Sequence, residues 1–123
     1  MKVCSKCGKR KQLDAFPFQG SKRRADCKEC AVKAERKRLY GISHKQYLEL
    51  TAAQHGVCAV CFQPESATFH GKLKQLSVDH DHKTGKIRGL LCSKCNTALG
   101  LVDESCERLL SLIAYMERSR HSA

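Results

Sequence analysis

Leu76-Ser77-Val78-Asp79-His80-Asp81-His82 begins with the pattern of a strand and ends in two carboxylates and two imidazoles. Lys83-Thr84-Gly85-Lys86 has the composition of a turn, and Ile87-Arg88-Gly89-Leu90-Leu91 has that of a return strand. Cys92-Ser93-Lys94-Cys95 follows and runs into Asn96, where we expect a helix to begin. The sequence therefore predicts a β-hairpin followed directly by a helix.

Eight of the nine cysteines form Cys-x-x-Cys pairs, namely Cys4/Cys7, Cys27/Cys30, Cys58/Cys61 and Cys92/Cys95. Such a knuckle turns both sulfurs toward one ion, and two knuckles complete a closed tetrahedral site. The sequence predicts two structural Zn²⁺ sites, and pairing neighbouring knuckles is simpler than an interleaved arrangement. A redox dithiol would need a thioredoxin-like βαβ pattern, which this sequence lacks.

The charge balance points to a polyanionic partner. Lys and Arg outnumber Asp and Glu 23 to 12, for a formal net charge of +11. Two zinc centres with four thiolates each would lower this to about +7, which is still basic. The excess favours nucleic acid, although lysines that only keep the protein soluble are an alternative. No apolar run resembles a signal peptide or a membrane span, so we expect a cytoplasmic protein with no membrane partner.

Residues 1–41 are predicted to form an amino-terminal module. The spacing between its knuckles is close to that of a four-cysteine zinc ribbon, which could bury Phe16 and Phe18 beside its metal. Residues 31–41 favour a basic connector helix. It would present four side chains to phosphates, or to solvent as a simple linker: Lys33, Arg36, Lys37 and Arg38.

Residues 42–123 are predicted to form the second domain. Ser43 and Gln46 make a capping box, flanked by Ile42 and Tyr47 as a hydrophobic staple, so we expect a helix over about 44–55. A polar loop then precedes the strand at Leu76. A final helix near 104–118 has an apolar stripe that includes Cys106, which we expect to be buried.

The Asp-His run can be interpreted chemically. Phosphodiester hydrolysis needs a base that works near neutral pH, which makes His80 the candidate. It also needs a hard cation, and Mg²⁺ prefers oxygen ligands such as those of Asp79 and Asn96. An ordinary polar turn and a cluster that binds zinc directly are the alternatives.

Cys58-Ala-Val-Cys61, then Leu-Ser-Val-Asp-His-Asp-His, then the run from Thr84 to Gly100 resemble the phage recombination endonuclease VII family of HNH nucleases. The resemblance covers roughly residues 47–115. It implies an α+β fold: a small zinc-stabilised ββα-metal (His-Me finger) core, here with an N-terminal zinc ribbon and flanking helices. It also implies that the ribbon adds grip on DNA.

The same resemblance implies roles for individual residues. A structural zinc ion would be bound by Cys58, Cys61, Cys92 and Cys95. Asp79 and Asn96 would bind the catalytic Mg²⁺ or Mn²⁺. His80 would be the general base, and His82 would assist at the scissile phosphate. The cut would leave a 5′-phosphate and a 3′-hydroxyl. By charge and position, Arg88 either assists the phosphate as well or pairs only with a carboxylate.

The sequence thus predicts a metal-dependent endonuclease that nicks or cuts duplex or branched DNA, in the host cytoplasm if a phage encodes it. A homodimer is a possible assembly. A non-catalytic double zinc finger that binds nucleic acid is the main alternative, and a protein-interaction zinc module is another. The double zinc finger does not explain why Asp79, His80 and Asn96 occur together, and the basic charge argues against the protein-interaction module.

Overall fold

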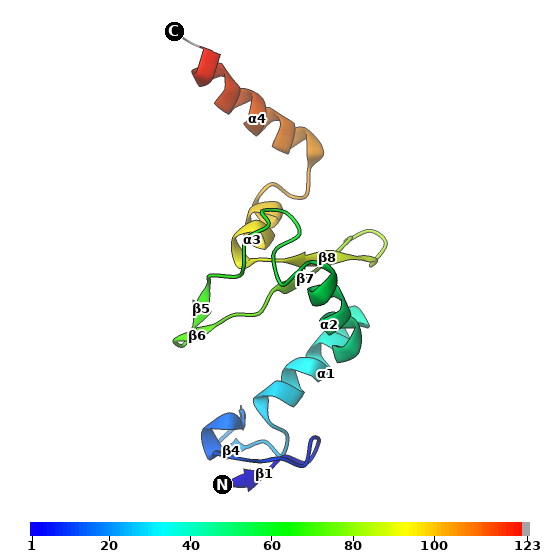
Figure 1. Ribbon diagram of the computed structural model, residues 1–123, viewed down its shortest axis with the longest axis vertical. Helices are drawn as coiled ribbons and strands as arrows, with labels where there is room; N and C mark the ends of the chain where they lie inside the picture. Colours follow the sequence, from blue (N-terminus) through cyan, green and yellow to red (C-terminus); the bar gives the residue numbers. More distant parts are fainter. Residues whose placement is uncertain (122–123) are drawn as a thin grey trace. The chain divides into compact units, whose positions relative to one another are not determined.

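The computed structural model describes residues 1–121, which form short strands and four α-helices (Figure 1). The chain divides into two compact units. The first holds residues 1–52 and 80–87, and the second holds residues 53–79 and the chain from Arg88 onward. The predicted α+β class is confirmed.

The first unit begins with two small antiparallel hairpins. Strands β1 (Lys2–Val3) and β2 (Arg10–Lys11) form one, and β3 (Phe18–Gln19) and β4 (Lys22–Arg23) form the other, with a 3-10 turn at Leu13–Ala15 between them. Phe16 is fully buried with Cys4 and Cys27 in the core of this module. The burial predicted for Phe18 is wrong, because the ring is 61% exposed and its cover is the guanidinium of Arg23.

Two helices complete the first unit. Helix α1 (Lys28–Tyr40) starts three residues earlier than predicted, directly after Cys27, and ends at Gly41, whose φ of 69° favours glycine. Helix α2 (His44–Ala53) has the predicted capping box: the Ser43 N–H donates to Gln46 Oε1, and the Gln46 N–H donates to Ser43 Oγ. The helix ends two residues before the predicted position.

The predicted hairpin and helix are both present, and all of their residues except those from His80 to Ile87 belong to the second unit. Strands β7 (Ser77–His80) and β8 (Ile87–Leu91) pair in a two-stranded sheet, and helix α3 (Ser93–Leu101) follows. The buried apolar side chains of this unit are Cys58, Leu76, Val78, Leu90, Leu91, Cys92 and Val102. A further hairpin of β5 (Thr68–Phe69) and β6 (Lys72–Leu73) lies in the stretch predicted as a polar loop. The order strand, strand, helix confirms the core predicted from the sequence.

The side chain of Gln54 ties the loop after α2 to β8. Its amide nitrogen donates to the carbonyl oxygens of Leu90 (2.9 Å) and Val57 (2.8 Å), and its amide oxygen accepts from the Leu90 N–H (2.9 Å). A Cβ atom added at Gly89 would lie only 3.2 Å from that amide oxygen. A side chain at this position of β8 would therefore have to displace the Gln54 amide by a few tenths of an ångström.

Helix α4 (Cys106–His121) has the predicted apolar stripe, but the stripe is exposed. Leu110 is 64% exposed and Ile113 is 49% exposed. The burial predicted for Cys106 is therefore wrong, because within residues 1–121 its helix face is not packed into a core. No helix among the described residues is long and apolar enough to cross a membrane.

Candidate active site

Asp79 is buried near the end of β7 and paired with Arg88 of β8. The guanidinium donates through Nε to Oδ2 (2.7 Å) and through Nη2 to Oδ1 (2.9 Å), and it also donates to Glu104. Bonds to Asp79 and then Glu104 raise the pKa of Arg88. The structure therefore brings Asp79 and Arg88 together, and it favours the interpretation in which Arg88 pairs with carboxylates.

Glu104 is missed by the sequence analysis because it lies in the link between α3 and α4. Glu104 and Asp103 both have positive φ angles (54° and 55°), a conformation uncommon for residues other than glycine. The Glu104 N–H donates to the carbonyl of Leu99, and its carboxylate meets Arg88. No motif in the sequence signals this contact.

Asn96 lies in the first turn of α3, directly after Cys95. Its backbone N–H donates to the carbonyl of Cys92, so the knuckle and the helix share their first hydrogen bond. The Asn96 side chain is exposed and has no hydrogen bond within residues 1–121. Its amide oxygen is therefore available to a ligand.

The start of α3 is fixed by Glu65, a second residue that the sequence does not signal. Its buried carboxylate accepts from the Ser93 N–H (2.8 Å), the Ala67 N–H (3.0 Å) and the Ser66 N–H (3.1 Å). Burial raises the pKa of Glu65, but the three N–H groups outweigh burial, so the net pKa is lowered. The Glu65 carboxylate joins the loop that follows the Cys58/Cys61 knuckle to the helix that carries Asn96.

His80 and His82 belong to the first unit, where the two imidazoles lie 4.7 Å apart between centroids. Tyr40, the last residue of α1, lies against His80 with a centroid distance of 5.2 Å and an interplanar angle of 49°. Between the histidines, the Asp81 carboxylate accepts from the Lys83 N–H (2.7 Å) and shapes the turn. Tyr40 is missed by the sequence analysis, since nothing in its neighbourhood points to His80.

The four knuckles assemble into two four-cysteine clusters, as neighbouring pairs. One contains Cys4, Cys7, Cys27 and Cys30, and the other contains Cys58, Cys61, Cys92 and Cys95. In each cluster the sulfurs lie within 4.8 Å of one another, so each could hold one metal ion. Four converging sulfurs are the donor set of a closed structural zinc site.

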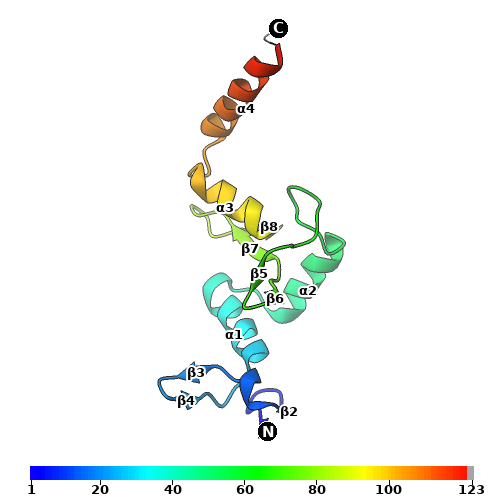
Figure 2. The same ribbon diagram turned by 90° about the vertical axis from the view of Figure 1, so that its left-hand side faces the viewer.

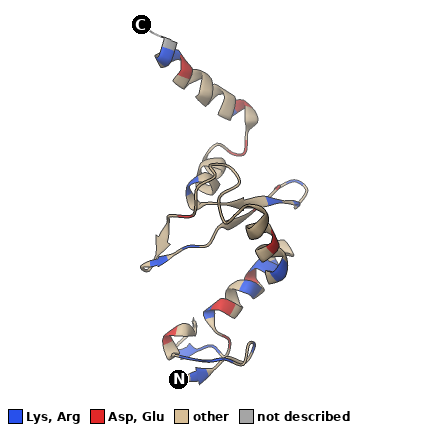
Figure 3. Ribbon diagram, in the orientation of Figure 1, with Lys and Arg blue, Asp and Glu red and all other residues tan. Residues whose placement is uncertain are grey.

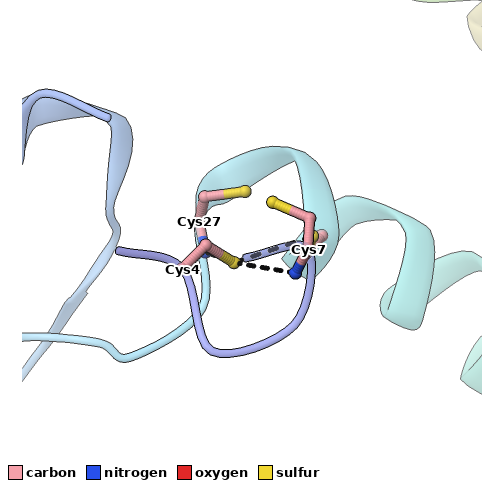
Figure 4. A group of neighbouring side chains, drawn as sticks. Cys4, Cys7 and Cys27 are labelled. Atoms are coloured by element: carbon pink, nitrogen blue, oxygen red, sulfur yellow. Dashed lines mark hydrogen bonds between the residues drawn. The ribbon is translucent and has the colours of Figure 1, made fainter. Parts of the chain in front are cut away.

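Backbone N–H groups surround the innermost sulfurs. The N–H groups of Cys7, Cys27 and Lys6 donate to Cys4 Sγ, and Figure 4 shows the bond from Cys7. These bonds, that of Cys7 foremost, outweigh burial and lower the pKa of Cys4 to about 6. At Cys58 burial opposes a similar set of bonds, and the pKa is again lowered to about 6. Both knuckles are thus built to hold a thiolate.

Lys11 adds a cation beside the first cluster. Its ammonium group donates to Cys27 Sγ (3.2 Å) and to the Glu29 carboxylate (3.2 Å). The bond to Cys27 is the main cause that raises the pKa of Lys11. The ammonium group of Lys11 is therefore engaged with the first cysteine cluster. The lysine-rich composition of the sequence does not indicate which lysine makes this contact.

The connector residues differ in their exposure. Lys37 and Arg38 are exposed and Lys33 is half-buried, and Figure 3 shows the basic residues along α1. The exposure predicted for Arg36 is wrong. Its guanidinium lies 3.6 Å from the ring centroid of Tyr47, and the side chain is buried because α2 supplies that aromatic face.

A match to a known family shows the class of protein. Residues 33–118 match the family described as recombination endonuclease VII, and the chain belongs to this family. The Gene 59 protein of Mycobacterium phage D29 is 42% identical over 80 residues, which are 64% of this chain and 46% of that protein. The Gene 59 protein of Mycobacterium phage L5 is 42% identical over 78 residues, 63% of this chain and 44% of that protein. The chain thus spans about half the length of these phage relatives.

Among solved structures, the chain is similar to the beta-beta-alpha-Me type II restriction endonuclease Hpy99I. The TM-score is 0.43 at 26% identity, over 96% of this chain and 65% of that one.

Proposed function

We propose that this protein is a metal-dependent DNA endonuclease of the HNH type, which nicks or cuts duplex or branched DNA. Membership of the recombination endonuclease VII family supports the proposal. The observation that carries it is the buried carboxylate of Asp79 directly before His80 on β7, with the free amide of Asn96 in the first turn of α3.

In this proposal His80 accepts the proton of the attacking water, and Tyr40 restrains its imidazole. His82 assists at the phosphate. The oxygen donors of Asp79 and Asn96 suit Mg²⁺ or Mn²⁺, which when bound would neutralise charge on the scissile phosphate and the leaving oxygen. Arg88 keeps the Asp79 carboxylate oriented while the site is free of DNA.

The two cysteine clusters hold Zn²⁺ and have a structural role, since four thiolates leave no open position for chemistry. Residues 1–41 form the module and connector, and residues 42–123 form the nuclease domain. The basic connector contacts DNA phosphates through Lys33, Lys37 and Arg38. A homodimer, and action in the cytoplasm of a phage-infected host, stay predictions.

The test is incubation of zinc-loaded protein with supercoiled plasmid, with and without Mg²⁺, beside a His80→Ala variant. Cutting that needs both the metal and His80, with DNA binding and zinc content retained in the variant, is the expected result. His55→Asn is the matched control, because His55 is exposed and asparagine tolerates its positive φ.

The main alternative is a double zinc finger that binds nucleic acid without cutting it. It accounts for the charge and for both cysteine clusters. If zinc-loaded, folded protein cuts neither plasmid nor branched nor single-stranded DNA with Mg²⁺ or Mn²⁺, the alternative replaces the nuclease.

A further inference from the structure

Phe18 is an exposed aromatic ring that the structure holds in a fixed position. It lies on β3 directly opposite Arg23 of β4, and the Arg23 guanidinium lies 3.8 Å from the centre of the ring. Arg23 is itself anchored, because its Nη1 donates to the carbonyl of Phe16 (2.8 Å) in the module core. One side of the ring is therefore covered by a cation while 61% of the side chain remains exposed.

The hairpin that carries Phe18 is short and constrained. Gly20 and Ser21 form its turn, and Gly20 has a φ of 65°, which suits a two-residue hairpin loop. The Arg24 N–H donates to the carbonyl of Pro17 (2.7 Å) and closes the base of the hairpin. Figure 2 shows β3 and β4 extending from the module to one side of α1. The ring thus stands on a small closed hairpin that projects from the module.

The module around this hairpin is strongly basic. Residues 1–30 contain nine Lys and Arg against three Asp and Glu. Five of the basic side chains are exposed and form no ion pair within the described residues: Lys6, Lys9, Arg10, Lys22 and Lys28. Lys22 lies next to Arg23 on the same hairpin. An exposed aromatic ring on the same hairpin as Lys22, in a module that carries further unpaired cations, suits a partner with flat apolar groups joined by phosphates.

We propose that residues 1–30 bind DNA at unpaired bases, with one base stacked on the free side of Phe18 and phosphates held by unpaired lysines and arginines of the same module. In duplex DNA the faces of the bases are covered by their neighbours, so an aromatic ring can stack on a base without the cost of unstacking only where the base is unpaired. The inference rests on the proposed function for DNA as substrate. It concerns a part of the chain outside the family match, which begins at Lys33.

The test measures binding of the full zinc-loaded chain, without added Mg²⁺, to a fluorescent single-stranded oligonucleotide and to the matching duplex. Phe18→Ala should weaken single-strand binding by about tenfold and change duplex binding by less than about twofold. Phe18→Trp should retain single-strand binding. Leu13→Ala is the matched control, because Leu13 is a 53% exposed aliphatic residue of the same module and should change nothing.

The outcomes separate this inference from the nuclease itself. Zinc content of each variant, and cutting of plasmid with Mg²⁺, are measured on the same preparations. The inference is overturned if the Phe18→Ala variant binds single strands as tightly as the wild type does. It is also overturned if the variant loses as much affinity for the duplex as for the single strand. Either result counts even if plasmid is cut. Phe18-dependent binding by a wild type that cuts neither plasmid nor branched nor single-stranded DNA with Mg²⁺ or Mn²⁺ would leave the inference standing and remove the nuclease.

Discussion

Asp79 and Arg88 are joined by two hydrogen bonds across the β7–β8 hairpin, so the carboxylate proposed to bind the catalytic metal already has a cation on it. Both oxygens of Asp79 are engaged, and Glu104 offers Arg88 a second acceptor. A metal ion at Asp79 would compete with this guanidinium. Arg88 therefore both orients the carboxylate and opposes the binding of a cation.

Replacing Arg88 with glutamine should make metal binding tighter and catalysis slower. Loss of the competing charge should lower the Mn²⁺ concentration for half-saturation by roughly fivefold, the equivalent of about 1 kcal/mol for a partly exposed pair. Loss of orientation should lower the cutting rate at saturating metal. Arg108→Gln, which removes an exposed pair with Asp103, is the control. Unchanged Mn²⁺ binding in Arg88→Gln would exclude the competition.

Tyr40 should act on the reaction through the orientation of His80. Tyr40→Ala should lower the single-turnover cutting rate by about fivefold, from loss of a ring contact of about 1 kcal/mol, with little change in DNA affinity. Tyr40→Phe should retain the rate, because the contact is made by the ring. Equal losses in the two variants would show that the hydroxyl group matters instead.

Glu65 should stabilise the second unit in a pH-dependent way. Its folded pKa is lowered, so its contribution is complete above the ordinary glutamate pKa and is lost as the pH falls through the folded value. Glu65→Gln should lower the free energy of unfolding by about 1–3 kcal/mol at pH 7. Denaturant titrations at fixed free zinc should show the difference from wild type shrinking toward pH 4. A pH-independent difference would contradict the role of the carboxylate.

The cysteines should separate into three groups by metal content. Cys92→Ser and Cys7→Ser should each lower the zinc content from two ions to one, and Cys92→Ser should also abolish cutting. Cys106→Ser should keep both ions, because Cys106 lies outside both clusters and is exposed. Elemental analysis with circular dichroism provides the measurement. Two ions retained in Cys92→Ser would refute the assignment of that cluster.

Arg36 should matter for stability and not for DNA contact. Arg36→Ala removes a buried guanidinium from the face of Tyr47 and should destabilise the first unit by about 1–2 kcal/mol. Lys37→Ala, one residue away and exposed, should instead weaken DNA binding and leave the melting temperature unchanged. Thermal melting and salt-dependent DNA binding distinguish the two. The opposite pattern would restore Arg36 as a phosphate contact.

The parts of the structure that local chemistry controls could be predicted. Cys-x-x-Cys spacing fixes the two clusters, the capping box at Ser43 fixes the start of α2, and the apolar runs around Asp79 fix the β7–β8 hairpin. The contacts of Tyr40 with His80 and of Glu65 with Ser93 join residues far apart in the chain. They depend on tertiary packing, which no local pattern encodes. The predicted burial of the apolar stripe on α4 was wrong for a different reason. Periodicity predicts that a helix has an apolar face, but it does not predict what covers that face.

Gln54 gives the small β7–β8 sheet a protection that two strands alone would lack. The outer backbone groups of a strand in a two-stranded sheet are a template on which another polypeptide can add. At Leu90 both groups are already taken by a side-chain amide, which has the same donor and acceptor as a peptide bond. The Ala59 N–H also donates a hydrogen bond to the Leu90 carbonyl. One glutamine thus occupies the place of a third strand at Leu90 and denies those two backbone groups to a neighbouring polypeptide.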